Sequence, residues 1–170
     1  MEIRRAVPAE APELQALMIA SKRYWGYTDE WMAAWISRQS LTAQYFVDHA
    51  GEVYVAVAEA TLAGFYALLP QGPLCILDDL WVARARIGTG IGRQLFAHAL
   101  RRASELGAGR MEWEAEPNAA GFYLRMGAQQ IGETTSRSGR VLPVMAIAVA
   151  LVTAPDVPDA PPKPGDHATH

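Results

Sequence analysis

Ile87-Gly88-Thr89-Gly90-Ile91-Gly92-Arg93 is the stretch that decides the fold, because it joins two segments of different periodicity. Residues 74–82 before it form a β-rich run. The residues after it repeat apolar side chains at helical spacing up to Gly107, where a helix C-terminus favours a left-handed residue. Three alternating glycines leave backbone N–H groups open, and the helix adds its positive N-terminal end. The stretch predicts a phosphate or pyrophosphate site between a strand and a helix, although a flexible turn would show the same glycines.

Two other phosphate-binding patterns fit this turn less well. A P-loop requires Gly-Lys followed by Ser or Thr, whereas here Ile91 follows Gly90 and Arg93 follows Gly92. A dinucleotide-binding fingerprint that starts at Gly88 would need its third glycine at position 93, which is an arginine. We therefore interpret the turn as a phosphate cradle of a different kind.

Working outward, the chain alternates between helical and β-rich segments. Strands are predicted at 3–7, 53–58, 62–69, 74–82, 111–115, 129–135 and 141–149, and helices after Pro8, after the N-cap Thr28, at 42–48, at 91–106 and from the N-cap Asn118 to Gly127. The short connections between 53–58 and 62–69, and between 129–135 and 141–149, favour antiparallel hairpins. This order predicts a mixed α/β (α+β) domain without an internal repeat.

Composition limits the number of domains and the kinds of partner. The 170 residues, 51% hydrophobic and 19% charged, fit one domain with a full core, which we place at residues 1–152. A net charge of −3 and a pI near 5.8 argue against a protein that binds nucleic acid. The longest apolar stretch, 141–152, contains Pro143 and is too short to span a membrane.

Cysteine usage and the two ends of the chain give further expectations. Cys75 is the single cysteine, and no apolar signal core follows Met1, so we expect a reduced, cytoplasmic protein. The tail 153–170 contains five prolines and few large apolar side chains, which predicts disorder. His167 and His170 lack Cys or carboxylate partners at ligand spacing, so no metal site is expected.

The glycine turn, together with a second segment, resembles the GNAT superfamily of N-acetyltransferases. That family places Arg or Gln, two residues, Gly, one residue and then Gly or Ala between a strand and a helix. Residues 87–92 match except that Ile87 stands at the first position, and Arg86 and Arg93 flank the turn as substitute cations. The segment Glu116-Pro117-Asn118-Ala119-Ala120-Gly121-Phe122-Tyr123-Leu124-Arg125-Met126-Gly127-Ala128 looks like the family's following helix motif.

The resemblance extends loosely from Ile3 to Leu151 and implies both a fold and a cosubstrate. The implied fold is a mostly antiparallel central sheet flanked by helices, in which a splayed strand pair holds acetyl coenzyme A. A bulge is implied in the strand Leu80-Trp81-Val82, with an amide near Val82 polarising the thioester carbonyl. The residues assigned in this way to the coenzyme are Leu80, Trp81, Val82, Ile87, Gly88, Thr89, Gly90, Ile91, Gly92, Arg93, Asn118, Phe122 and Tyr123.

Two kinds of catalytic residue are expected. Tyr123 would protonate the departing thiolate, although it would equally fit a core aromatic on a short helix. An acceptor amine with a free pKa of about 10 must lose a proton before it attacks, which calls for a carboxylate or a carboxylate-held water. The candidates are Asp78, Asp79, Glu112, Glu114 and Glu116. Asp78 is the first candidate, because its side chain points to the same face of the strand as those of Leu80 and Val82, and Asp79 is the second. A bulge would reverse this alternation. Each acid would also fit a solvated strand residue.

Aromatic residues gather where the family builds its acceptor pocket. Trp25, Tyr27 and Trp31, with Trp35 further along, would suit a cationic amine through cation–π contact, and Glu114 would form part of the rim. The alternative is that these rings pack in the core or in a homodimer interface.

The sequence thus predicts direct transfer of an acetyl group from acetyl-CoA to a primary amine, on a small molecule or on a protein. The rival interpretation is a non-catalytic acyl-CoA binding or sensing module on the same fold. A generic nucleotide-binding domain fits the sequence less well. The identity of the acceptor stays open, because pocket shape rather than a linear motif sets it.

Overall fold

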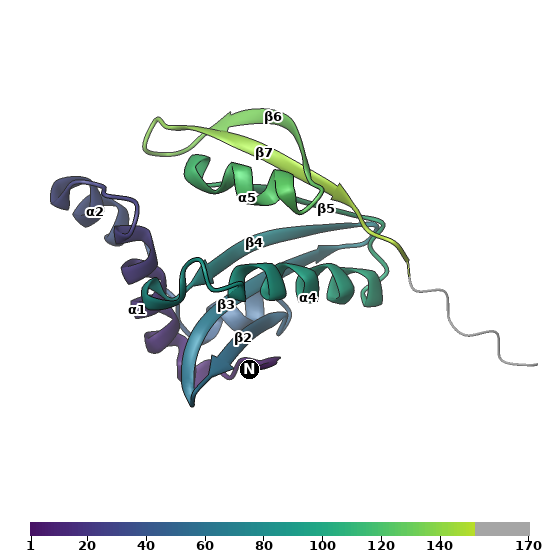
Figure 1. The fold of residues 1–170 in the computed structure, drawn as a ribbon, viewed down its shortest axis with the longest axis horizontal. Helices are drawn as coiled ribbons and strands as arrows, with labels where there is room; N and C mark the ends of the chain where they lie inside the picture. The colour runs from purple at the N-terminus through teal and green to yellow at the C-terminus, as the bar shows by residue number, and fades with distance from the viewer. Residues whose placement is uncertain (152–170) are drawn as a thin grey trace, which may run out of the picture.

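Seven strands form one mixed sheet in the order β1-β2-β3-β4-β5-β7-β6 (Figure 1). The strands are β1 (Glu2–Arg5), β2 (Val53–Ala58), β3 (Thr61–Gln71), β4 (Leu74–Val82), β5 (Arg110–Glu114), β6 (Gln129–Thr135) and β7 (Val141–Ala148). Every neighbouring pair is antiparallel except β4 and β5, which are parallel. Both predicted hairpins, β2–β3 and β6–β7, are confirmed.

This computed structural model describes residues 1–151, so the predicted disordered tail at 153–170 lies outside the described residues. The helices are α1 (Ala11–Arg23), α2 (Asp29–Ile36), α3 (Ala43–Asp48), α4 (Ile91–Glu105) and α5 (Ala120–Arg125), with short 3₁₀ turns at Pro8–Glu10, Arg84–Arg86 and Pro117–Ala119. None of these helices is long and apolar enough to cross a membrane. The N-cap predicted at Thr28 is confirmed, because its side chain accepts the backbone N–H of Trp31 at 3.2 Å.

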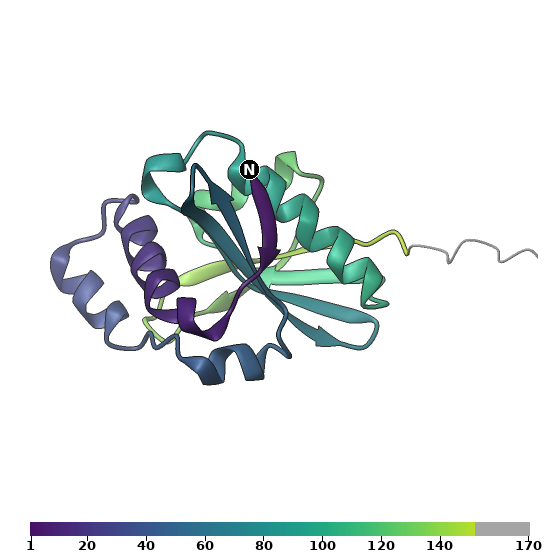
Figure 2. The same ribbon diagram turned by 90° about the horizontal axis from the view of Figure 1, so that it is seen from below.

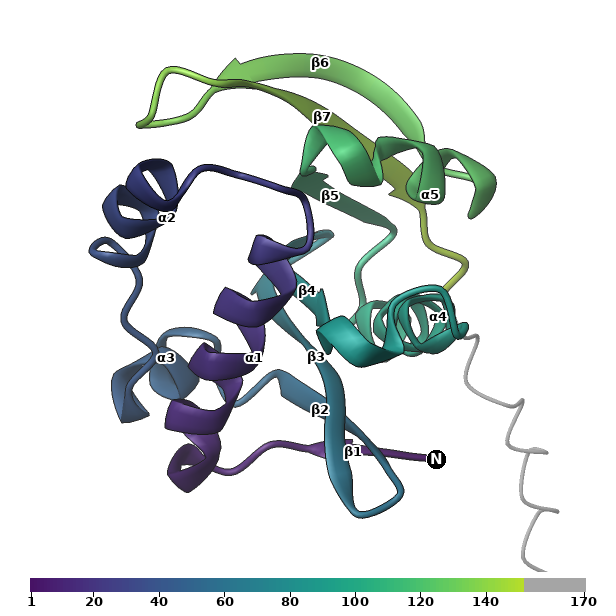
Figure 3. The same cartoon turned by 60° about the vertical axis from the view of Figure 1, so that its left-hand side comes forward.

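The sheet separates two apolar cores, one on each face. Side chains alternate along β2, so Val53 and Val55 pack with Leu14 and Met18 of α1, whereas Tyr54 joins the core under α4. Figure 3 shows α1 and α3 on one side of β2–β4 and α4 on the other, and Figure 2 shows β1–β4 between α1 and α4. Because each face of β2 and β3 is covered by helices, both strands carry apolar side chains at nearly every position.

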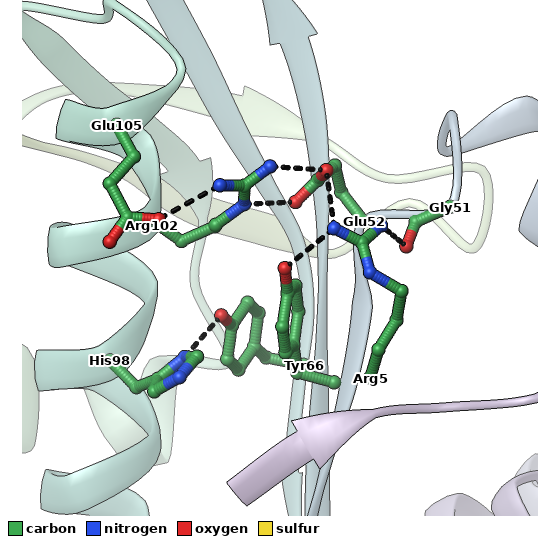
Figure 4. Close-up of polar contacts among 8 residues, drawn as sticks. Arg5, Gly51, Glu52, Tyr66, His98, Arg102 and Glu105 are labelled. Atoms are coloured by element: carbon green, nitrogen blue, oxygen red, sulfur yellow. Dashed lines mark hydrogen bonds and ion pairs between the residues drawn. The ribbon is translucent and has the colours of Figure 1, made fainter.

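Buried ion pairs hold α4 against the first strands of the sheet (Figure 4). The Glu52 carboxylate accepts from Arg102 of α4 at 2.7 and 2.9 Å and from Arg5 of β1 at 3.3 Å. Arg5 also donates to the Tyr54 hydroxyl at 2.9 Å, so two cations share one buried acid. This network fixes the direction in which α4, and therefore the turn at its start, points.

The parallel pair β4–β5 opens into a wedge. Its register runs from Leu74 opposite Arg110 to Ile76 opposite Glu112 and ends there, while β4 continues on β3 to Val82. The bulge in β4 lies at Asp78, because Ala67 faces Asp79 and the next residue, Leu68, faces Leu77. The bulge was expected within Leu80-Trp81-Val82 and lies earlier in the strand. Because Asp78 is itself the bulge, the alternation of side chains cannot assign it to the face of Leu80 and Val82.

One predicted helix start also differs. Asn118 is not the N-cap of the helix before Gly127, because it lies inside the 3₁₀ turn Pro117–Ala119 and α5 begins after Ala119. The Asn118 amide instead donates to the Glu116 carboxylate at 3.0 Å. Pro117 explains the shift, since its fixed φ favours the first position of a helical turn and makes Glu116 the N-cap of that turn.

Candidate active site

A cleft of about 1190 Å³ occupies the wedge between β4 and β5. It runs from the glycine turn before α4, past Val82 and Tyr123, to the side chains of Lys22 and Arg140. The wedge exists because β4 and β5 stop pairing with each other partway along their length. Beyond that point, β4 continues to pair with β3, and β5 continues to pair with β7. Backbone groups of β4 on that edge are therefore left open to a bound molecule.

At one end of the cleft, the glycine turn has the geometry of an anion site. Gly88 and Gly90 have φ of +81° and +89°, and no atom lies within 4 Å of the position that a Cβ would take at either residue. Gly90 is the N-cap of α4 and no side chain caps that helix, so its first N–H groups stay available. Gly92 serves packing, because a Cβ there would lie 3.3 Å from Val82 Cγ2.

The cations near the turn divide into two groups. Arg93 lines the cleft, and Arg125 of α5 lines it as well. Arg86 forms an ion pair with Glu59 on the β2–β3 turn instead, so it does not replace the missing Arg or Gln at position 87. Arg93 is the flanking cation that can reach a phosphate in the cleft.

Midway along the cleft, Tyr123 and Trp113 form its apolar floor. Their rings lie 4.9 Å apart, and burial raises the pKa of the Tyr123 hydroxyl, so it stays protonated at neutral pH. Within residues 1–151 that hydroxyl makes no hydrogen bond. Trp113 Nε1 is a buried donor without a partner in the same part of the chain. Two unused polar groups at one place in a cleft suit a ligand that brings its own oxygen or sulfur atoms.

Two acids and a histidine lie where β4 meets α3. Asp79 accepts hydrogen bonds from the Tyr45 hydroxyl at 2.6 Å and from Trp81 Nε1 at 2.7 Å. Burial nevertheless raises the pKa of Asp79 to about 6, so this carboxyl can exchange a proton near neutral pH. Asp78 is more exposed and pairs with His49 Nε2 at 2.8 Å.

The same residues also have the side-chain types of a metal site. His49, Asp78 and Asp79 offer three ligand atoms within 4.8 Å of one another. His49 Nδ1 is already bonded to the Tyr45 carbonyl at 2.6 Å, and its Nε2 is bonded to Asp78. Burial alone would lower the pKa of His49, but these two bonds outweigh it and raise the pKa. Both ring nitrogens of His49 are therefore engaged with protein acceptors, so His49 links Tyr45 to Asp78.

At the far end of the cleft, an aromatic cage surrounds the ammonium of Lys22. Lys22 Nζ lies 5.1 to 5.8 Å from four ring centroids, those of Tyr27, Trp31, Trp35 and Trp81. Tyr27 and Trp31 are stacked with centroids 4.1 Å apart. Three of the aromatic residues singled out in the sequence, Tyr27, Trp31 and Trp35, therefore lie together, and a lysine of this chain occupies the space between them.

The counter-ion of that lysine is Glu116, which follows β5. Its carboxylate accepts from Lys22 Nζ at 2.5 Å, from the Tyr27 hydroxyl at 2.5 Å and from Arg140 at 3.0 Å. Burial would raise the pKa of Glu116, but these donors outweigh it and hold the pKa at about 2. Burial also lowers the pKa of Lys22, since it disfavours the ammonium. The pair is thus ionised, shielded from water and tightly hydrogen-bonded.

Most of the residues predicted for the site line this one cleft. They are Trp25, Trp31, Asp78, Asp79, Leu80, Trp81, Val82, Ile87, Gly88, Gly90, Gly92, Arg93, Glu114, Asn118, Phe122 and Tyr123. Four others do not line it: Tyr27 reaches it through Glu116, Thr89 bonds to the Arg86 carbonyl, Ile91 is buried at the start of α4, and Glu112 pairs with Arg110. Trp25 lies outside the cage and packs edge-on against Tyr24.

Sequence reasoning missed Lys22, Arg140, Tyr45 and His49. Lys22 had a signal that was overlooked, because it is the only lysine before residue 163 and it stands beside the aromatic run. Arg140 and His49 had none, since each reaches the site from a turn or a helix distant in sequence. Trp81 was assigned to the coenzyme, and its ring also belongs to the cage.

Comparisons with known proteins agree with this arrangement. The model of the acetyltransferase (GNAT) family matches residues 14–128. A 5-NmdU N-acetyltransferase of Pseudomonas phage PaMx11 is 27% identical over 146 residues, which cover 82% of this chain and 95% of the phage protein.

Solved structures share the fold. A GCN5-related N-acetyltransferase from Rhodopseudomonas palustris superposes with a TM-score of 0.73 at 23% identity, covering 86% of this chain and 94% of its own. The PaiA N-acetyltransferase of Thermoplasma acidophilum, solved with coenzyme A, gives 0.67 at 18% identity, covering 86% and 98%. From the family match and the splayed sheet, this chain belongs to the acetyltransferase (GNAT) family.

Proposed function

We propose that this chain transfers an acetyl group from acetyl-CoA directly to a primary amine, without a covalent enzyme intermediate. The observation that carries the proposal is the continuous cleft that joins an open anion-binding turn to an aromatic cage already holding an alkylammonium. The PaiA relative, which is similar in fold, was solved with coenzyme A, and the phage relative is named an N-acetyltransferase.

The coenzyme would lie along the wedge. The amides of the turn from Gly88 to Arg93 would bind the pyrophosphate, since the first turn of α4 leaves its N–H groups uncapped. The pantetheine arm would pair with the free edge of β4 at Leu80-Trp81-Val82. Asn118 and Phe122, which line the cleft near its middle, would contact that arm. The thioester would then lie near Val82, whose amide would stabilise the oxyanion.

Proton transfers would use the two titratable groups in the middle of the cleft. Asp79, with a pKa raised to about 6 by burial, would take the proton of the acceptor amine directly or through a water. Tyr123, protonated at neutral pH, would give a proton to the departing thiolate. We prefer Asp79 to Asp78, because the carboxylate of Asp78 is engaged with His49 and its residue is the bulge. Glu114, exposed at the end of β5, is the remaining acid on the rim.

The acceptor would be a small-molecule amine or an amine on a protein. The Lys22 ammonium in the cage supports an acceptor whose cationic group would bind beside the same four rings. The name of the phage relative adds 5-NmdU to the compounds worth testing. We propose no role for membranes, nucleic acid or a resident metal in the reaction.

A coenzyme A release assay across a panel of amines tests this proposal. The panel would contain diamines, amino acids, aminoglycosides, peptides with free N-termini and 5-NmdU, each assayed with acetyl-CoA. Release that depends on an amine, and is lost with Tyr123→Phe, would support transfer. Tight binding of acetyl-CoA without release for any amine would instead support the non-catalytic binding module.

A further inference from the structure

Lys22 spans the wedge in which the thioester would lie. Its Nζ contacts the Glu116 carboxylate, which follows β5, at 2.5 Å, and it lies 5.8 Å from the ring of Trp81, which precedes Val82 on β4. The ammonium therefore lies between a ring carried by β4 and a carboxylate just beyond β5. Lys22 also lines the cleft in which the coenzyme would bind.

The residue type at this position is unusual for this chain. The sequence has thirteen arginines and two lysines, Lys22 and Lys163, so lysine is avoided almost everywhere. An arginine would make the same ion pair with Glu116 and would stack well on the rings, but its guanidinium is neither deprotonated nor nucleophilic. Lys22 carries a primary amine, and burial lowers its pKa, so its proton is removed more easily than that of an exposed lysine. The chain thus keeps its single described primary side-chain amine inside its own candidate acceptor site.

We propose that, with acetyl-CoA bound and no other amine in the cleft, this chain acetylates its own Lys22. The inference rests on the proposed function. In the step, Lys22 loses one proton to water, and its nitrogen lone pair attacks the carbonyl carbon of the thioester to form the C–N bond. The nitrogen loses its second proton as the tetrahedral oxyanion collapses and the C–S bond breaks. Coenzyme A leaves as the thiol after its sulfur takes one proton, so the net products are acetyl-lysine, coenzyme A and one released proton.

Acetylation would change the charge of the cage. In the unmodified chain, Lys22 and Arg140 share one acid, Glu116. An acetyl-lysine carries no charge and cannot pair with a carboxylate, so Glu116 would keep Arg140 alone as its cation. One face of Glu116 would then lack its lysine partner and could pair with the ammonium of a separate acceptor. Self-acetylation would therefore act as a single priming event rather than as repeated turnover.

The test is peptide mass spectrometry on the full chain after incubation with acetyl-CoA alone. We expect one acetyl group per chain at Lys22, released coenzyme A in equal amount, and a rate independent of protein concentration, because the amine and the thioester are held in one molecule. Lys163 should react at least about 100-fold more slowly, since holding two reactants together gives a large effective concentration. Lys163→Arg is the matched control and should leave the modification of Lys22 unchanged.

Two further variants decide between catalysis and simple chemical reactivity. Lys22→Arg retains the ion pair with Glu116 and should abolish the fast incorporation, while Tyr123→Phe should slow it together with turnover of an added amine. Equal labelling of Lys22 and Lys163, unaffected by Tyr123→Phe, would overturn the inference. A chain that turns over an added amine, but whose Lys22 stays unmodified after incubation with acetyl-CoA alone, would overturn it too and would leave the proposed function standing. Absence of coenzyme binding and of all transfer would remove both.

Discussion

The Tyr45 hydroxyl donates a 2.6 Å hydrogen bond to the Asp79 carboxylate and so joins α3 to β4 beside the cleft. Burial raises the pKa of Asp79 to about 6 even though Tyr45 and Trp81 both donate to it. Desolvation therefore outweighs two hydrogen bonds at this site. A carboxyl with that pKa is a base only above about pH 6, which gives the reaction a pH dependence that can be measured.

Asp79→Asn should lower turnover by roughly 10²- to 10⁴-fold near neutral pH, because it removes the proposed general base. Part of the loss should return as pH rises towards the acceptor's own pKa of about 10, where the amine deprotonates unaided. The rate of the wild type should fall as pH decreases through about 6. The measurement is kcat/KM against pH. Asp78→Asn is the control and should keep the wild-type profile; alkaline rescue in that variant alone would give the role to Asp78.

The same pKa shift has a consequence for stability. The pKa of Asp79 is raised in the folded state from an ordinary value of 3.8 to about 6, so the folded chain binds this proton more tightly than the unfolded chain does. The carboxyl therefore destabilises the fold progressively as pH rises through this window. The melting temperature of Asp79→Asn minus that of the wild type should be higher at pH 7 than at pH 4. Equal differences at both pH values would contradict the shift.

Glu116→Gln should destabilise the fold by about 3–5 kcal/mol, because it leaves the Lys22 and Arg140 charges together without their shared acid. Lys22→Met combined with Glu116→Gln should recover part of that loss. The pKa of Glu116 is lowered from 4.5 to about 2, so its contribution is present above pH 4.5 and is lost as pH falls through this window. Urea unfolding at several pH values measures this. Glu105→Gln, an exposed partner of Arg102, is the control, with a change within about 0.5 kcal/mol.

Gly90→Val should abolish thermal stabilisation by acetyl-CoA. Its φ of +89° disfavours a β-branched residue, and a side chain there would fill the open space above the turn. Gly72→Val is the matched control, because Gly72 also has a positive φ of +67° with open space around it but lies in the β3–β4 turn, outside the cleft. Both variants should lose about 1–3 kcal/mol of stability from backbone strain. Only Gly90→Val should lose the ligand-induced shift in Tm, and a retained shift would remove the cradle from the mechanism.

Tyr123→Phe should lower kcat by roughly ten- to ten-thousand-fold while the affinity for acetyl-CoA stays within a few-fold, since a general acid contributes in about that range. The ring remains, so packing against Trp113 and Phe96 is preserved. Tyr66→Phe, which removes a buried hydroxyl bonded to His98 at 2.7 Å on α4, should lower stability by about 1 kcal/mol and leave kcat unchanged. Isothermal titration and steady-state kinetics separate the two effects. An unchanged kcat in Tyr123→Phe would limit this residue to packing.

Much of the fold could be predicted from local patterns. The β-rich run 74–82 became β4 with the same bounds, and the helix after Gly90 was correct because its apolar spacing extends over several turns. The predictions were wrong where a single residue decides the local backbone geometry. The bulge was expected within residues 80–82 but lies at Asp78, and the helix start expected at Asn118 was displaced by Pro117.

The sequence by itself determined the strand–glycine turn–helix unit, the hairpins and the family, because backbone freedom at glycine and side-chain periodicity are local properties. Only the tertiary structure decided what fills the aromatic cage. Lys22, Glu116 and Arg140 lie far apart in the chain, and they meet because α1, the end of β5 and the β6–β7 turn converge on the wedge. The lowered pKa of Lys22 and the raised pKa of Asp79 likewise arise from burial, which depends on the packing of several elements and is absent from any one of them.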